Sequence, residues 1–183
     1  MCKLLLRLAL DAIVDKHHAL DPTEVSFLKH KGNMKEHYLD DLYVGQTFGS
    51  PSVTVTAEAI KAFAEQFDFQ PFHLDDQAAK GTFFGELVAS GWHTACLTMK
   101  LLLEGDYRPA GGFIGGKADE LRWPKPTRPG DVLSCTTEIL EIRPSATRPE
   151  QGTVKMRTTT VNASNEVVYV LVMNGIAKRR PTV

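Results

Sequence analysis

Cysteine is scarce in this chain of 183 residues, where it occurs only at Cys2, Cys96 and Cys135. The three positions lie far apart and form neither a CxxC motif nor the ligand spacing of a zinc site. The sequence therefore predicts no disulfide framework and no metal site, and it favours a reducing, cytoplasmic location. We interpret Cys96 as a small apolar residue packed inside a helix.

An excess of charge is also missing, since the formal net charge is −1. Proteins that bind nucleic acid or an anionic membrane surface usually carry a basic excess, so we expect neither partner. No apolar run is long enough to span a bilayer. The N-terminal run KLLLRLALDAIV is short and is interrupted by Asp11 and Asp15, and no small-residue cleavage site of a secretory signal follows it.

Internal repeats and low-complexity segments are absent as well, which excludes a solenoid or a fibrous protein. Hydrophobic residues make up 43% and charged residues 23% of the chain, as in an ordinary globular protein. The length suits one domain with a sizeable core. Residues 29–33 resemble a linker, so we expect an N-terminal extension of undetermined structure at 1–33 and a single core domain at 34–183.

Two helices are predicted in the first half of the core domain. The stretch AEAIKAFAEQF, residues 57–67, has apolar residues at helical spacing, and Thr56 is placed to cap it. From Gly85 to about Leu103, apolar residues occur almost all round, which predicts a long helix buried on every side. Small residues within this second helix indicate that another element packs closely against it.

The rest of the core domain has the pattern of β-strands. A strand is expected to end near Thr56, and four longer β-branched segments follow Gly105, with turns near residues 129–131, 148–150 and 164–165. One long helix and about five antiparallel strands predict an α+β domain in which the sheet wraps around the helix.

A polar stretch between the two helices carries the chemistry that we regard as functional. Asp68 follows the first helix and His73 comes five residues later, and Pro71 between them prevents the helix from continuing. A carboxylate and an imidazole on a loop held by packed helices can act together as an acid–base pair. At the expected helix start, the unpaired N–H of Gly85 can stabilise a developing oxyanion.

Three segments together, DFQPFHLDDQAA, FGELVASGWHTA and RWPKPTRPGDVL, resemble the MaoC-like (R)-specific enoyl-CoA hydratase and dehydratase family, which has a hotdog fold. The positions that match its Asp–Asn–Pro–His motif and the small residue after it are Asp68, Pro71, His73 and Ala79. Gln70 stands where the family usually has Asn. Gly85 falls where the family has the glycine whose backbone N–H holds the thioester oxygen, although Glu86 follows it where a small or apolar residue is usual.

The resemblance implies an acyl-CoA hydratase or dehydratase that adds or removes water across the 2,3 double bond of an enoyl thioester. Asp68 is expected to be the general base, His73 to share the proton transfers and the Gly85 N–H to hold the oxyanion. The substrate would be a coenzyme A thioester, with no cofactor and no metal. The family also implies a homodimer or a dimer of dimers, in which edge strands pair between two copies.

Two other functions stay open. A hotdog thioesterase usually presents a carboxylate from the central helix or near it, and Glu86 is the carboxylate placed in that way. A non-catalytic subunit that binds acyl thioesters would keep the fold but would have no need of Asp68 and His73.

Several single residues have both a functional and a structural interpretation. Ser90 either lines an acyl pocket or packs against the sheet, and we favour a hydrogen-bonded core role for His93. Trp92 and Trp123 are interpreted as core or dimer-contact aromatics. The basic residues that could meet coenzyme A phosphates, but that a plain charged surface explains better, are Arg122, Lys125 and Arg128.

Overall fold

The computed structural model describes residues 35–181, so the expected N-terminal extension at 1–33 lies outside the described residues. Its helices and strands are, in chain order, η1 (Leu39–Asp41), β1 (Thr47–Thr54), α3 (Ala57–Phe67), α4 (Pro71–Leu74), α5 (Asp76–Lys80), α6 (Gly91–Glu104), β2 (Ile114–Arg122), β3 (Val132–Pro144), β4 (Gln151–Val161) and β5 (Val167–Lys178). In the described residues, no helix is long and apolar enough to cross a membrane.

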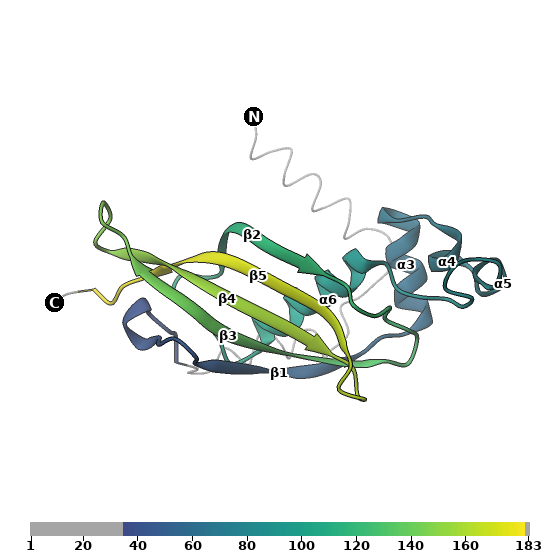
Figure 1. The fold of residues 1–183 in the computed structure, drawn as a ribbon, viewed down its shortest axis with the longest axis horizontal. Coiled ribbons are helices and arrows are strands. Elements are labelled where there is room, and N and C mark those ends of the chain that lie inside the picture. The colour runs from purple at the N-terminus through teal and green to yellow at the C-terminus, as the bar shows by residue number, and fades with distance from the viewer. Residues whose placement is uncertain (1–34, 182–183) are drawn as a thin grey trace, which may run out of the picture. The chain divides into compact units, whose positions relative to one another are not determined.

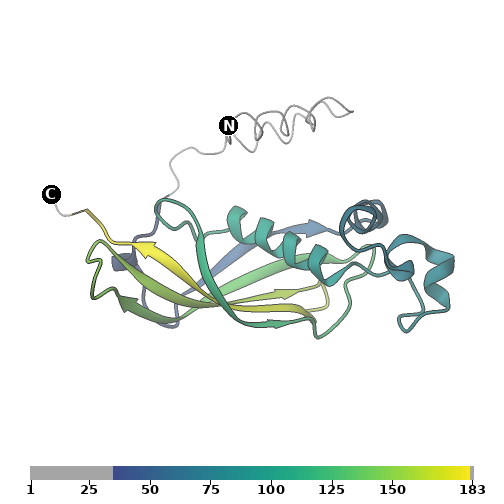
Figure 2. The same cartoon turned by 90° about the horizontal axis from the view of Figure 1, so that it is seen from above.

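The five strands form one antiparallel sheet in the order β1-β3-β4-β5-β2 (Figure 1). Burial alternates along β4, as expected for a strand with one face toward a core. The helix α6 runs along one face of this sheet (Figure 2). A long helix against an antiparallel sheet confirms the predicted α+β hotdog fold.

The core lies between α6 and the sheet. Leu101 of α6 is fully buried and belongs to one apolar cluster with Leu133 of β3 and Val168 of β5. The opposite side of the helix is open, since Trp92 is 59% and Leu103 is 51% exposed. The prediction that this helix is buried on every side is therefore wrong, because the five strands cover only one side of it.

Cys96 shares this open side of α6. Its predicted place inside the packed core is wrong for the same reason. Cys135 of β3, by contrast, is buried in the core, and burial raises the pKa of its thiol.

The predicted start of the long helix at Gly85 is also wrong. The backbone of Gly85 has φ +71°, a left-handed conformation that a right-handed helix does not contain. The helix begins at Gly91, and the Ser90 side chain caps it by accepting a hydrogen bond from the Trp92 N–H at 3.2 Å. The segment from Leu87 to Ala89 is apolar, but it belongs to no helix or strand.

The helix α3 confirms the prediction for residues 57–67. Thr56 caps it by accepting a hydrogen bond from the Ala59 N–H at 3.1 Å, and its inner face buries Ile60 and Ala64 completely. At the other end, the Asp68 N–H donates to the Ala64 carbonyl, and the chain then leaves the helix. The packed inner face of α3 thus fixes the position from which Asp68 extends.

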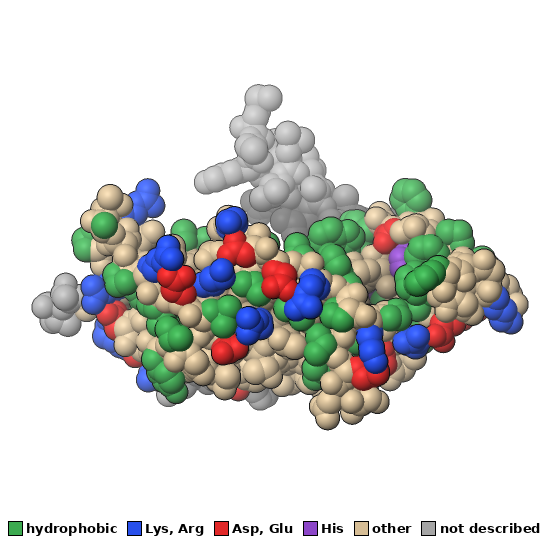
Figure 3. Space-filling model, in the orientation of Figure 1, with side chains coloured by type: hydrophobic (Ala, Val, Ile, Leu, Met, Phe, Trp, Pro, Cys, Tyr) green, Lys and Arg blue, Asp and Glu red, His purple; other side chains and the backbone are tan. Residues whose placement is uncertain are grey.

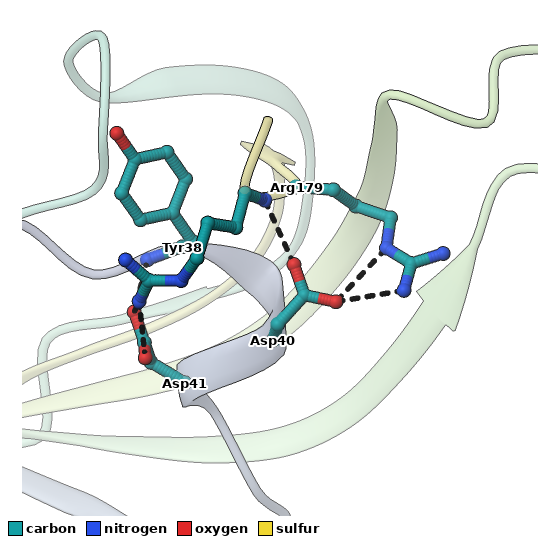
Figure 4. A network of polar contacts seen from close by, with 5 residues as sticks. Tyr38, Asp40, Asp41 and Arg179 are labelled. Atoms are coloured by element: carbon teal, nitrogen blue, oxygen red, sulfur yellow. Dashed lines mark hydrogen bonds and ion pairs between the residues drawn. The ribbon is translucent and has the colours of Figure 1, made fainter. Parts of the chain in front are cut away.

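The end of β5 is tied to η1 by the ion pairs drawn in Figure 4. The guanidinium of Arg179 donates twice to one carboxylate oxygen of Asp40, and the Arg180 N–H donates to the other oxygen at 2.8 Å. The Arg180 side chain pairs with Asp41 and lies over the Tyr38 ring, 4.7 Å from its centroid. Hydrogen bonds from Arg179 and Arg180 lower the pKa of the Asp40 carboxyl.

Candidate active site

The loop after α3 brings Asp68 and His73 together, as the sequence predicted. Asp68 is the C-cap of α3, and Pro71 then starts the short helix α4 at its first position. One turn of α4 carries His73 back toward the end of α3. As a result, Asp68 Oδ2 lies 3.4 Å from His73 Nε2.

The orientation of the His73 ring is fixed on its other side. Its Nδ1 lies 2.7 Å from the carbonyl oxygen of Val88, and a carbonyl can only accept a hydrogen bond, so Nδ1 carries the proton. In the neutral ring Nε2 is then the free acceptor. Only 4% of His73 is exposed, so this base is held in a buried frame.

Three neighbours hold the Asp68 carboxylate. Burial pushes the Asp68 pKa upward, but hydrogen bonds from Ser90 and Gln70 and the nearby His73 ring outweigh burial and lower the pKa below its usual value. The Gln70 amide donates to Oδ1 at 2.8 Å. Gln70 therefore contacts the carboxylate itself and contributes to its lowered pKa.

The segment before α6 links these groups to the helix. The Val88 N–H donates to the Phe72 carbonyl at 3.0 Å, and the Ala89 N–H donates to the Thr127 carbonyl at 2.8 Å. Ser90, which is 1% exposed, caps α6 and helps to lower the pKa of the Asp68 carboxyl. Ser90 does not line the cavity beside Asp68 and His73, so its predicted role in an acyl pocket stays a prediction.

Asp68 and His73 open into one cavity of about 530 Å³. The start of α6 lies at this cavity, because Gly91 and Thr94 line it together with Thr127. Five aromatic side chains complete much of the wall, namely Phe72, Phe83, Phe84, Trp92 and Trp123. A polar pair inside an aromatic cavity is the usual arrangement of a small-molecule site.

Gly85 lies apart from this arrangement. Its N–H donates to the Thr82 carbonyl at 3.2 Å within a turn, and it does not line the cavity. The structure therefore does not support Gly85 as the oxyanion donor. Gly91 fits better, because it lines the cavity and, as the first residue of α6, has no acceptor for its N–H within the helix. A serine cap before Gly91 was the sequence signal for this helix start.

The charged residues near the cavity are paired with one another. Glu86, the carboxylate of the thioesterase alternative, does not line the cavity and forms an exposed ion pair with Arg128. Lys125 lines the cavity and pairs with Glu166. These pairs favour the plain surface interpretation of the basic residues, and they leave Asp68 as the carboxylate that lines the cavity.

His93 is buried, as expected, but the predicted hydrogen bonding of its ring is wrong at one nitrogen. The ring stacks on Phe63 with centroids 4.9 Å apart, and Nδ1 has no hydrogen-bond partner. Burial lowers the pKa of His93, which keeps the ring neutral. His93 does not line the cavity, so it supports the helix packing beside the site.

A second hollow, of about 380 Å³, lies on the outer face of the sheet, where basic and acidic side chains are mixed (Figure 3). Asp119, which lines it, pairs with Lys117 and Lys155 at 2.8 and 2.9 Å and accepts a hydrogen bond from Asn174. These contacts neutralise the charges locally. Within residues 35–181, no group of three or more His, Cys, Asp or Glu side chains is arranged to hold a metal ion.

Comparison with known proteins points to one family. The MaoC-like domain matches this chain over residues 42–162. The crystal structure of a MaoC-like dehydratase from Rhodospirillum rubrum is 48% identical, covers 80% of this chain and 99% of its own, and superimposes with a TM-score of 0.77. The (R)-hydratase PhaJ1 of Pseudomonas aeruginosa is 26% identical over 78% of this chain and 86% of its own, with a TM-score of 0.64. A 3-hydroxybutyryl-CoA dehydratase of Methylorubrum extorquens is 31% identical over 61% of this chain and 69% of its own length.

Proposed function

Because the chain belongs to the MaoC-like domain family, we propose that it adds or removes water across the 2,3 double bond of an enoyl-CoA thioester. One observation carries this proposal: the Asp68 carboxylate and His73 Nε2 lie 3.4 Å apart and line the same cavity. The reaction needs an acid–base pair and an oxyanion donor, and it needs neither a cofactor nor a metal.

In the hydration direction, Asp68 and His73 act on one water molecule. The ionised carboxylate and the neutral Nε2 both accept hydrogen bonds, so they can share the two protons of a water placed between them. As the water oxygen attacks the β-carbon, one proton passes to the pair, with Asp68 as the general base. The same pair then returns a proton to the α-carbon, which completes the addition of H and OH.

Negative charge develops on the thioester oxygen during this attack. The N-terminal end of α6 carries unpaired N–H groups and a partial positive charge, both of which stabilise an oxyanion. We assign this role to the Gly91 N–H in place of Gly85. Ser90 lowers the pKa of Asp68 and immediately precedes Gly91, so the base and the proposed oxyanion donor both depend on the capped end of α6.

Crotonyl-CoA is the first substrate to test, because it is the dehydration product of 3-hydroxybutyryl-CoA, the substrate in the name of one relative. A hydratase removes the enoyl absorbance of crotonyl-CoA without releasing free thiol. Release of free thiol would instead indicate a thioesterase. Binding of butyryl-CoA without either reaction, on this and longer enoyl-CoAs, would indicate a non-catalytic subunit and refute the proposal.

We also propose that two copies assemble. The edge strand β2 pairs with β5 on one side only within the described residues, and an unpaired edge is a liability unless another strand covers it. Apolar side chains beside this edge and on the open side of α6 are also exposed, among them Trp92, Leu103, Ile114 and Leu121. Light scattering should therefore give the mass of a dimer or of a dimer of dimers, and a monomer mass at micromolar concentration would contradict it.

A further inference from the structure

A small groove lies along α6, beyond the helix residues that line the active-site cavity. It has a volume of about 260 Å³ and is lined by Ala95, Cys96, Met99 and Leu102 of α6 and by Tyr169 and Leu171 of β5. The cavity is lined by Trp92 and Thr94, so the two spaces follow one another along consecutive turns of the same helix.

The indole ring of Trp123 lines the cavity and packs against one lining residue of each space. It lies edge-on to Trp92, which lines the cavity, with ring centroids 5.5 Å apart. Its centroid also lies 5.5 Å from that of Tyr169, which lines the groove. Trp123 is thus a wall of the cavity that also packs against the Tyr169 ring of the groove.

Trp123 is fixed in this position. Its Nε1 donates to the Gly91 carbonyl at 2.7 Å, and a Cβ atom on Gly91 would lie only 3.0 Å from the same nitrogen. The glycine therefore allows the indole to lie directly on the first turn of α6. A ring that is hydrogen-bonded on one edge and packed against two others does not move aside freely for a ligand.

The groove behind Trp123 suits an aliphatic chain. Its lining is apolar apart from the Cys96 thiol, the Tyr169 hydroxyl and Thr98. The Thr98 hydroxyl is hydrogen-bonded to the Thr160 hydroxyl at 2.7 Å, as donor or acceptor, so it does not need a hydrogen bond from a ligand. Such a lining favours methylene groups over polar ones.

We propose that Trp123 determines the length of the acyl chain, by closing the passage from the Asp68–His73 cavity into the groove along α6. This inference rests on the proposed function, since it takes the acyl end of a coenzyme A thioester as the occupant. The protein accepts short acyl groups, and opening the wall admits medium-length chains.

The test measures binding of butyryl-CoA and octanoyl-CoA to the full chain by calorimetry, which requires no turnover. The unmodified protein should bind octanoyl-CoA no more tightly than butyryl-CoA. Trp123→Leu should raise affinity for octanoyl-CoA relative to butyryl-CoA by about tenfold or more, because each methylene that enters an apolar pocket counts for roughly that much. Trp123→Phe keeps an aromatic wall and should keep the short-chain preference.

A second substitution distinguishes the opening of the groove from a general loosening of the structure around the cavity. Ala95→Leu fills the groove from α6, so adding it to Trp123→Leu should restore the short-chain preference. Tighter binding of octanoyl-CoA by the unmodified protein would overturn the inference, and this measurement does not depend on any variant folding. An unchanged affinity ratio in a folded Trp123→Leu would overturn it too. Unchanged affinities with loss of the dimer in light scattering would show that the groove contacts a second copy.

The hydration assay distinguishes a failure of the chain-length inference from a failure of the proposed function. If the affinity ratio shifts as expected but no variant hydrates crotonyl-CoA or octenoyl-CoA, the reaction is wrong and Trp123 still sets the acyl length that is bound. If hydration occurs with an unchanged chain-length profile, the reaction stands and the role of Trp123 is wrong.

Discussion

His73 Nδ1 donates to the Val88 carbonyl oxygen across 2.7 Å, and this bond determines which nitrogen of the ring faces Asp68. Val88 lies in the irregular segment before α6, and its own N–H donates back to Phe72 at 3.0 Å. The two bonds clamp α4 onto this segment. The tautomer of the base is therefore set by the backbone of the segment that leads into α6.

Replacing either member of the pair should reduce turnover. Asp68→Asn and His73→Gln are each expected to lower hydration rates by roughly 10²–10⁴-fold. The double variant should lose much less than the product of the two, because the residues act on one water as a unit. Steady-state kinetics on the best enoyl-CoA checks this, and near-normal turnover by either single variant would disprove the assignment.

The same two variants should differ in stability. Asn at position 68 can still accept from Gln70, so Asp68→Asn should change the free energy of unfolding little. His73→Gln risks leaving the buried Val88 carbonyl without its donor, which costs roughly 1–3 kcal/mol. Urea unfolding measures both effects and identifies any loss of activity that comes from unfolding.

Ser90→Ala should shift the pH dependence of activity. The Ser90 hydroxyl helps to lower the Asp68 pKa, so its removal should raise that pKa and move the acidic limb of kcat/KM to higher pH. Loss of the helix cap should also cost about 0.5–2 kcal/mol of stability. Thr56→Ala is the matched control, because it removes the cap of α3 without touching the carboxylate. If Ser90→Ala and Thr56→Ala had the same pH profile, Ser90 would act only as a helix cap and not on the Asp68 carboxylate.

The sequence predicted those parts of the site that depend on local patterns. The cap at Thr56, the helix 57–67 and the Asp68–His73 loop all follow from residue spacing and from Pro71. The start of α6 did not, because the apolar run from Gly85 gives no sign that this glycine adopts a left-handed turn. The spacing of apolar residues is the same in the turn at Gly85 and in α6, so it does not mark where the helix begins.

Contacts between distant parts of the chain were the other feature that could not be predicted from the sequence. The pairing of Glu86 with Arg128 joins two segments that no local pattern connects, and it holds the Glu86 carboxylate in an exposed ion pair. Trp123 follows β2 but contacts α6 and β5. Its place as a wall depends on the register of β2 against β5, which single-strand patterns do not specify.

Stability should fall in mild acid because of His93. Burial lowers its folded-state pKa below the unfolded value of about 6.5, so the unfolded chain binds the proton more readily. Above the unfolded-state pKa, His93 has no effect on the dependence of stability on pH. As the pH falls from the unfolded-state pKa toward the folded-state pKa, the free energy of unfolding decreases. His93→Leu should flatten this dependence, as measured by urea unfolding at pH about 7.5 and about 5.5. The same slope in both proteins would show that other groups cause the loss.

Gly105→Ala should destabilise the far end of α6. An added Cβ would lie 2.6 Å from the Gly49 carbonyl oxygen, and that oxygen is held in place because it accepts from the Asp106 N–H at 3.0 Å. Relief requires a backbone shift, so the free energy of unfolding should fall by roughly 1–3 kcal/mol. Gly116→Ala is the control, because its nearest neighbour is the Asn174 carbonyl at 3.6 Å, and it should stay within about 0.5 kcal/mol of the unmodified protein.

The same pair of variants tests whether the two ends of α6 act independently. Gly105 follows the last residue of the helix, whereas Ser90 and Gly91 form the end at the cavity. The folded fraction of Gly105→Ala should therefore hydrate its substrate at the unmodified rate, because a local backbone shift at the β1 contact does not displace a capped first turn. Turnover per folded molecule, measured well below the melting temperature, checks this. A tenfold loss in Gly105→Ala but not in Gly116→Ala would mean that α6 moves as a rigid rod and that its β1 contact positions the Asp68–His73 site.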